Sequence, residues 1–111
     1  MTKDSVNTDL LSFLRDATTP FHAVGVMAER LLAAGFVPWS DASREPIVAG
    51  GKYFTVRNDS SLIAFTAGTD LSHGFRLVGA HTDSPNLSVR PNPSVKRFGC
   101  NLLAVDVYGG A

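Results

Sequence analysis

The sequence predicts an α/β or α+β layer structure in which two N-terminal helices precede a mixed β-sheet. In the first third of the chain, apolar residues recur at helical spacing. The remainder carries short runs rich in β-branched and aromatic residues, separated by Gly, Pro, Asn and Asp. These two patterns predict helices first and about five strands after them.

Both helices are predicted from apolar stripes and from residues that favour helix ends. The first is expected over residues 5–17 and the second from Pro20. The stripes comprise Leu10, Leu11, Phe13 and Leu14 in the first helix, and Phe21, Val24, Met27, Ala28, Leu31 and Leu32 in the second. Thr19 is expected to cap the second helix, because its hydroxyl can accept from the unpaired N–H groups of the first turn. Gly35 is expected to end it.

The strands are predicted from alternating or continuous apolar runs bounded by turn residues. The runs are residues 52–57, 61–66, 75–80, 87–90 and 102–108. Asn58, Asp59 and Ser60 favour a turn, so the first two runs are expected to form a hairpin. Residues 75–80 are expected to be a buried strand, because their C-terminal half is continuously apolar. Pro91 and Pro93 confine the next run to a sheet edge or a strand end.

Composition argues against several classes of function. The 111 residues contain ten basic and ten acidic side chains, so no charge excess favours nucleic acid or an anionic membrane. No run approaches the ~18 apolar residues of a membrane helix. The start of the chain has no apolar signal region behind Lys3, so a cytoplasmic location is expected. The single Cys100 allows neither an internal disulfide nor a cysteine-rich zinc site.

Residues 77–85 are the segment most suggestive of chemistry. An apolar run ends there in His81-Thr82-Asp83, and residues two apart on an extended chain point to the same side. Asp83 could accept the second ring N–H of His81 and make the other nitrogen a better metal ligand, or it could be a ligand itself. The alternative is a histidine at a strand end, with Asp83 and Ser84 opening a turn before Pro85.

Further metal ligands are scarce in this sequence, although a zinc site needs at least three. The two glutamates, Glu29 and Glu45, lie in a helix and in a polar loop. His22 is expected to be a packed or solvated residue of a first helical turn, and His73 an exposed loop residue. Asp106 could be a metal ligand, but its position in a strand favours a carboxylate at a sheet edge or face. The chain therefore offers one good metal ligand and not a complete site.

Four motifs together resemble a known family. They are residues 19–23 (TPFHA), 57–64 (RNDSSLIA), 78–85 (VGAHTDSP) and 107–110 (VYGG), in this order. The set is similar to the N-terminal part of the aspartyl aminopeptidases, which are cytosolic zinc metallopeptidases with an α/β catalytic domain. The resemblance covers nearly the whole chain.

The resemblance implies a hydrolase that removes an N-terminal residue, often acidic, from peptide substrates. Two zinc ions would activate water for attack on the scissile carbonyl, with a glutamate as general base. By motif, His81 would be a zinc ligand. Asp83 would orient His81 and lie near the metal without necessarily binding it. No role follows for His22.

The resemblance also implies that residues 1–111 are an incomplete, N-terminal part of such a catalytic domain. Family members are several times longer, and their other ligands and dimerisation domain would lie beyond Ala111. We therefore expect the chain alone to be inactive and marginal or oligomeric in solution, and the full-length protein to form a homo-oligomer. The alternatives are a non-enzymatic module acting in folding or subunit association, and a two-zinc peptidase with another side-chain preference.

Overall fold

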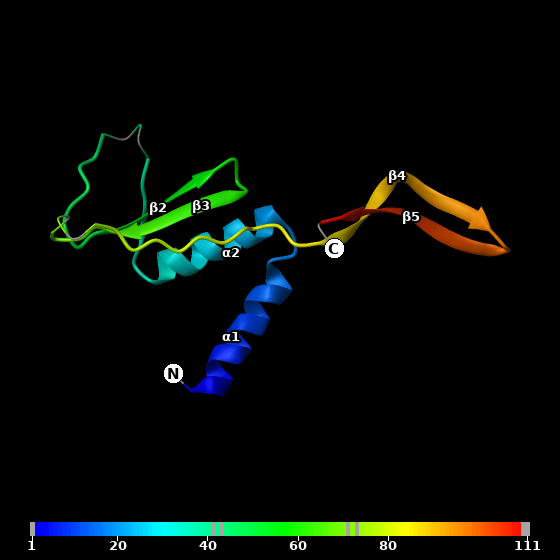
Figure 1. The fold of residues 1–111 in the computed structure, drawn as a ribbon, viewed down its shortest axis with the longest axis horizontal. Helices are drawn as coiled ribbons and strands as arrows, with labels where there is room; N and C mark the ends of the chain where they lie inside the picture. Colours follow the sequence, from blue (N-terminus) through cyan, green and yellow to red (C-terminus); the bar gives the residue numbers. More distant parts are fainter. Residues whose placement is uncertain (1, 41, 43, 71, 73, 110–111) are drawn as a thin grey trace.

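The computed structural model describes residues 2–40, 42, 44–70, 72 and 74–109. Its elements are α1 (Lys3–Asp16), α2 (Pro20–Ala33), β1 (Val37–Pro38), β2 (Lys52–Arg57), β3 (Ser61–Thr66), β4 (Asn86–Arg97) and β5 (Cys100–Tyr108). Strands β1, β2 and β3 form one sheet, in which β1 is parallel and β3 antiparallel to β2. Figure 1 shows the β4–β5 hairpin set apart from it. The prediction of two helices followed by a mixed sheet is confirmed.

The ends of α2 are those that the sequence predicts. Thr19 is the N-cap, and its Oγ1 accepts from the backbone N–H of His22 at 3.3 Å. Pro20 occupies the first turn. Gly35 follows the helix with φ +81°, a conformation that glycine adopts without a Cβ clash. Capping residues therefore fix where α2 begins and ends.

Removal of the α2 cap should destabilise the chain measurably. Thr19→Ala is expected to lower the free energy of unfolding by about 1 kcal/mol, because one N–H of the first turn loses its acceptor. Urea unfolding followed by far-ultraviolet circular dichroism measures this change. Thr18→Ala, one residue further from the helix, is the matched control and should change the free energy by less than about 0.5 kcal/mol. Equal effects of the two substitutions would contradict the capping role.

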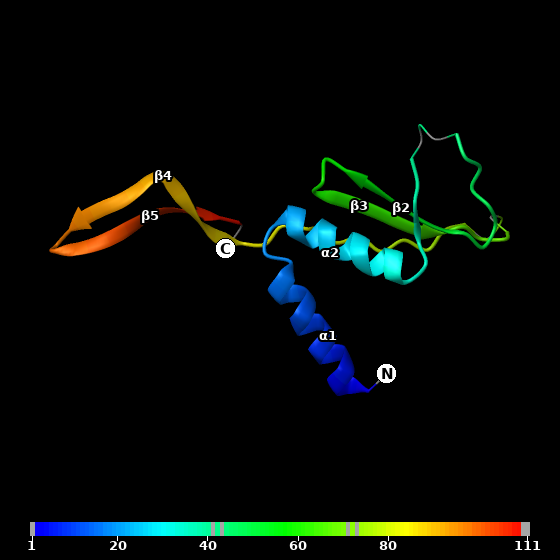
Figure 2. The same cartoon turned by 180° about the vertical axis from the view of Figure 1, so that it is seen from behind.

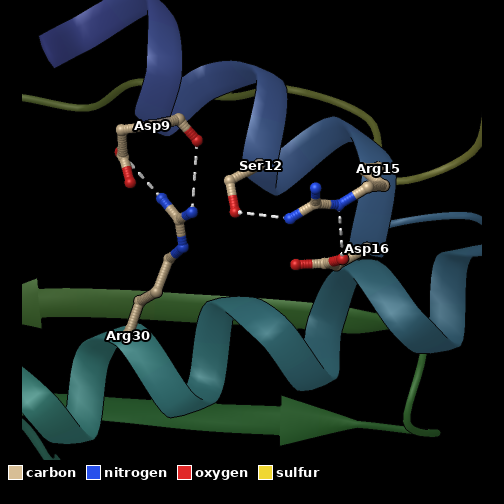
Figure 3. Close-up of polar contacts among 5 residues, drawn as sticks. All are labelled: Asp9, Ser12, Arg15, Asp16 and Arg30. Carbon is tan, nitrogen blue, oxygen red and sulfur yellow. Dashed lines mark hydrogen bonds and ion pairs between the residues drawn. The ribbon is translucent and has the colours of Figure 1, made fainter.

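Helix α1 contacts α2 through an exposed polar junction (Figure 3). Arg30 of α2 donates from Nη1 to Asp9 Oδ2 at 2.9 Å, and its guanidinium lies 5.2 Å from the ring centroid of Phe13. No α1 residue is buried, and Leu11 of its apolar stripe is 67% exposed. An exposed ion pair contributes at most about 1 kcal/mol. The stripe thus predicts the helix correctly, but the described part of the chain leaves it uncovered.

The few buried residues lie on both faces of strand β2, under α2 on one side and beside the loop before β2 on the other. The buried apolar residues are Ala23 and Val24 of α2 and Tyr53 and Phe54 of β2. Neighbours on a strand face opposite sides of the sheet. Tyr53 faces the loop before β2, because its hydroxyl accepts from the Val48 N–H at 3.0 Å. Lys52, on the same side of β2 as Phe54, donates from Nζ to the carbonyl of Ala34 at the end of α2, so Phe54 lies on the face covered by α2.

The β2–β3 hairpin is the most accurately predicted element. Its bounds agree with the predicted runs, and Arg57 pairs with Ser61 across the turn. Asn58 and Asp59 both have positive φ, 51° and 53°, as in a type I′ turn. The Ser60 N–H donates to the Arg57 carbonyl at 3.2 Å and closes this turn.

Strand β4 continues through its two prolines by means of a register shift. The pairing with β5 shifts between Val89 and Ser94, which flank Pro91 and Pro93. A bulge tolerates residues that cannot donate to a ladder. β4 has only β5 as a neighbour among the described strands, as the edge alternative predicted, but it continues past the prolines to Arg97 and does not end near Arg90. Figure 2 shows the hairpin extending away from α2.

The prediction of a buried strand over residues 75–80 is wrong for this structure. The segment has no strand assignment, and Phe75, Leu77 and Val78 are 85%, 92% and 96% exposed. A buried strand of this kind needs hydrogen-bonded neighbours and covered faces. None of the described strands lies beside the segment as a ladder partner.

The chain is far from compact. Its radius of gyration is 19.8 Å, against about 13 Å for a compact domain of this length. It exposes 9328 Å², against about 5,900 Å² for a compact protein of this mass. Among the described residues, no helix combines the length and apolar character that a membrane span requires. Most of the apolar surface therefore has no cover within the described chain.

Candidate functional site

His81 and Asp83 lie together in the short loop before β4. The His81 Nδ1 atom is 2.7 Å from the Asp83 backbone carbonyl oxygen and 3.1 Å from Asp83 Oδ1. Both oxygens are acceptors, so Nδ1 is the donor in this geometry, and Nε2 is the nitrogen that could present a lone pair to a metal. The His81 side chain is 78% exposed. The predicted proximity of the two residues is observed, while the metal-binding role of His81 remains a prediction.

Tyr108, at the end of β5, completes this cluster. Its hydroxyl donates to Asp83 Oδ2 at 3.0 Å. This hydrogen bond is the main reason that the pKa of the Asp83 carboxyl lies below its usual value, since it stabilises the charged form. The same contact with a carboxylate raises the pKa of Tyr108. Asp83 is therefore held as a carboxylate between a phenol and an imidazole.

Sequence reasoning did not identify Tyr108 as a site residue. It belongs to the fourth motif of the family resemblance, which was the available signal, but it lies 25 positions beyond Asp83. Thr82 was also missed; its hydroxyl donates to the Ser60 carbonyl at 2.8 Å and ties the loop to the β2–β3 turn. Only the tertiary arrangement brings these partners together.

A cleft of about 250 Å³ adjoins the cluster. It lies between the start of α2, represented by Thr19 and Pro20, and the loop that contains Thr82 and Asp83. Tyr108 contributes to the same wall. The lining thus mixes apolar surface with the Asp83 carboxylate and the hydroxyl groups of residues that include Thr19, Thr82 and Tyr108.

The other candidate residues lie outside the cluster. His22 is exposed, and its Nδ1 contacts Thr19 Oγ1 at 2.7 Å. Asp106 accepts from Arg90 Nε at 2.6 Å. Cys100 is exposed at the start of β5. His73 lies outside the described residues. The basic residues Arg90, Lys96 and Arg97 lie on strand β4.

The described residues do not form a complete metal site. No three of their His, Cys, Asp or Glu side chains are close enough together to hold an ion. Of the histidines in the described ranges, His81 has a carboxylate facing Nδ1, an arrangement that orients an imidazole toward a metal through its other nitrogen, whereas His22 Nδ1 faces a hydroxyl. The structure thus shows part of an α/β domain in which His81 is a candidate metal ligand.

Comparison with known proteins gives the family. The profile described as "Aminopeptidase I zinc metalloprotease (M18)" matches residues 13–111. The chain belongs to this M18 family of zinc metallopeptidases. It is 48% identical over 111 residues to "Probable M18 family aminopeptidase 2" of Pseudomonas putida (strain GB-1).

Two solved structures share the fold. An M18 aminopeptidase from Thermotoga maritima is 30% identical, with a TM-score of 0.75 over 96% of this chain and 23% of its own. A chain in the cryo-EM structure of the Ape4 and Nbr1 complex is 37% identical, with a TM-score of 0.76 over 93% of this chain and 20% of its own. The alignment with the P. putida relative covers 98% of this chain and 26% of the relative's length. The chain thus spans about a quarter of its curated relatives.

Proposed function

We propose that the full-length protein is a zinc-dependent aminopeptidase that removes acidic N-terminal residues, Asp or Glu, from peptides at a two-zinc site in the cytoplasm. Membership of the M18 family over residues 13–111 is the observation that carries this proposal. The acidic preference comes from the resemblance to aspartyl aminopeptidases.

Residues 1–111 would contribute the first zinc ligand, the N-terminal part of the catalytic domain and part of its sheet. His81 would bind zinc through Nε2, because Nδ1 already faces two Asp83 oxygens. A zinc ion held there supplies Lewis-acid polarisation of the scissile carbonyl. Asp83 would keep the imidazole oriented. The described residues bring no second and third ligand to His81, so the chain alone should not hydrolyse peptides.

The substrate preference has a direct test. Purified full-length protein should show a higher kcat/KM for substrates with N-terminal Asp or Glu than for those with Leu or Lys, by at least about tenfold, or 1.4 kcal/mol. Removal of zinc with a chelator should abolish hydrolysis, and added zinc should restore it. A preference for Leu or Lys with intact zinc dependence would contradict the acidic specificity alone. Activity that survives complete zinc removal would contradict the zinc mechanism.

A role in subunit association is the second candidate. The exposed apolar residues of the β4–β5 hairpin favour it: Leu87, Val89, Leu103 and Val107 are 55–75% exposed. Homo-oligomerisation of the full-length protein would cover such a surface. Sedimentation of the full-length protein, with and without substitution of Leu103 and Val107 by serine, tests this role. A monomeric wild-type protein would contradict it.

A further inference from the structure

The Asp83 carboxylate bridges two side chains that come from different parts of the chain. Its Oδ2 accepts from the Tyr108 hydroxyl at 3.0 Å, and its Oδ1 lies 3.1 Å from His81 Nδ1. The line of contacts therefore runs from phenol to carboxylate to imidazole. Its free end is His81 Nε2, the atom that would meet a metal.

The backbone fixes the position of Tyr108 relative to the His81 loop. Tyr108 pairs with Asn86 at the start of β4, directly after that loop. The next residue, Gly109, has φ +115°, and a Cβ placed there would lie 2.7 Å from the Pro85 Cβ. Only glycine permits this close approach. The end of β5 is thus held against Pro85, and the Tyr108 hydroxyl is held within reach of Asp83.

Asp83 needs such an anchor because it is only partly covered. Its side chain is 46% exposed, so water competes for both carboxylate oxygens. A hydrogen bond from a neutral hydroxyl to a carboxylate is among the stronger kinds. By occupying Oδ2, Tyr108 selects the rotamer in which Oδ1 faces the imidazole.

We propose that Tyr108 is a positioning residue for the zinc ligand His81, acting by fixing the Asp83 carboxylate against Nδ1 so that Nε2 is presented to the ion. The proposal rests on the proposed function, since it takes His81 as a zinc ligand. Its rival is that the Asp83 backbone carbonyl, 2.7 Å from Nδ1, orients the imidazole alone. Under that rival the Tyr108 hydroxyl is dispensable.

The proposal and its rival predict different zinc affinities for variants of the full-length protein. Competition with a chromogenic chelator measures these affinities. Tyr108→Phe removes only the hydroxyl and should raise the zinc Kd about threefold to tenfold. Asp83→Ala removes the direct partner and should raise it about 10–100-fold. In the double variant, Tyr108→Phe should add no further loss, because its effect passes through Asp83. A merely structural effect of the ring would instead add to that of Asp83→Ala.

Tyr53→Phe is the matched control. This substitution also removes a phenol hydroxyl. That hydroxyl accepts from the Val48 N–H in the loop before β2 and has no contact with Asp83 among the described hydrogen bonds. The substitution should alter the melting temperature without altering zinc affinity. An unchanged zinc Kd in Tyr108→Phe, or equal changes in Tyr108→Phe and Tyr53→Phe, would overturn the proposal.

A His81→Ala variant distinguishes failure of this proposal from failure of the proposed function. If His81→Ala loses zinc while Tyr108→Phe keeps wild-type affinity, only the role of Tyr108 falls. If His81→Ala itself keeps wild-type affinity, the zinc role of His81 falls and the role of Tyr108 falls with it.

Discussion

Replacement of His81 by alanine should weaken zinc binding by the full-length protein more than any other single change in this chain. Loss of a direct partner of a metal-bound histidine costs about 10–100-fold in affinity, and loss of the ligand itself should exceed that range. Peptide hydrolysis should fall in parallel at zinc concentrations that saturate the wild-type protein. Zinc content after gel filtration and the rate of peptide hydrolysis measure both effects.

His22→Ala is the matched control for this experiment. His22 is also an exposed histidine, and it contacts Thr19, which lines the same cleft as Asp83. Its Nδ1 faces a hydroxyl, and no carboxylate orients it among the described contacts. Zinc content should therefore remain that of the wild-type protein. A loss of zinc in His22→Ala with full zinc retention in His81→Ala would reverse the assignment.

Phe54→Ala should have the largest effect on the stability of the 111-residue chain. Phe54 is 4% exposed and lies on the face of β2 that α2 covers. Truncation of a buried phenylalanine costs about 3–5 kcal/mol. That amount approaches the whole stability of a small domain, so α2 should no longer hold to the sheet. Urea unfolding followed by circular dichroism measures the loss, and Phe54→Leu gives a milder variant if Phe54→Ala does not fold.

Phe75→Ala provides the contrast, because Phe75 is 85% exposed in this structure. The same substitution there should change the free energy of unfolding by less than about 0.5 kcal/mol. A loss at Phe75 as large as that at Phe54 would show that residues 75–80 are buried in solution, as the sequence pattern alone predicts.

Local patterns account for the elements that the sequence predicted well. The β2–β3 hairpin could be predicted because the Asn58-Asp59 turn and both strands lie within fifteen consecutive residues. The same holds for the Thr19-Pro20 start of α2. Each of these features depends on neighbours only a few positions away.

Features that depend on distant partners were not predictable. Residues 75–80 have the composition of a buried strand, but the described chain gives them no ladder partner. The contact between Tyr108 and Asp83 spans 25 positions and follows from the β4–β5 register. The His81–Asp83 contact spans two positions, and spacing alone suggested it. Contacts between residues that are close in the sequence could therefore be predicted, whereas contacts between distant residues could not.

The exposure of residues 74–80 affects how readily the polypeptide associates with other chains. In the described chain α2 and the β2–β3 hairpin bury side chains against each other, whereas Leu77 and Val78 are almost fully exposed. A short apolar segment with a single charge, Arg76, is prone to pair with the same segment of another chain. At high concentration these 111 residues alone should therefore aggregate, while dilute protein should unfold and refold in urea. Chaperones that bind extended apolar peptides should recognise this segment.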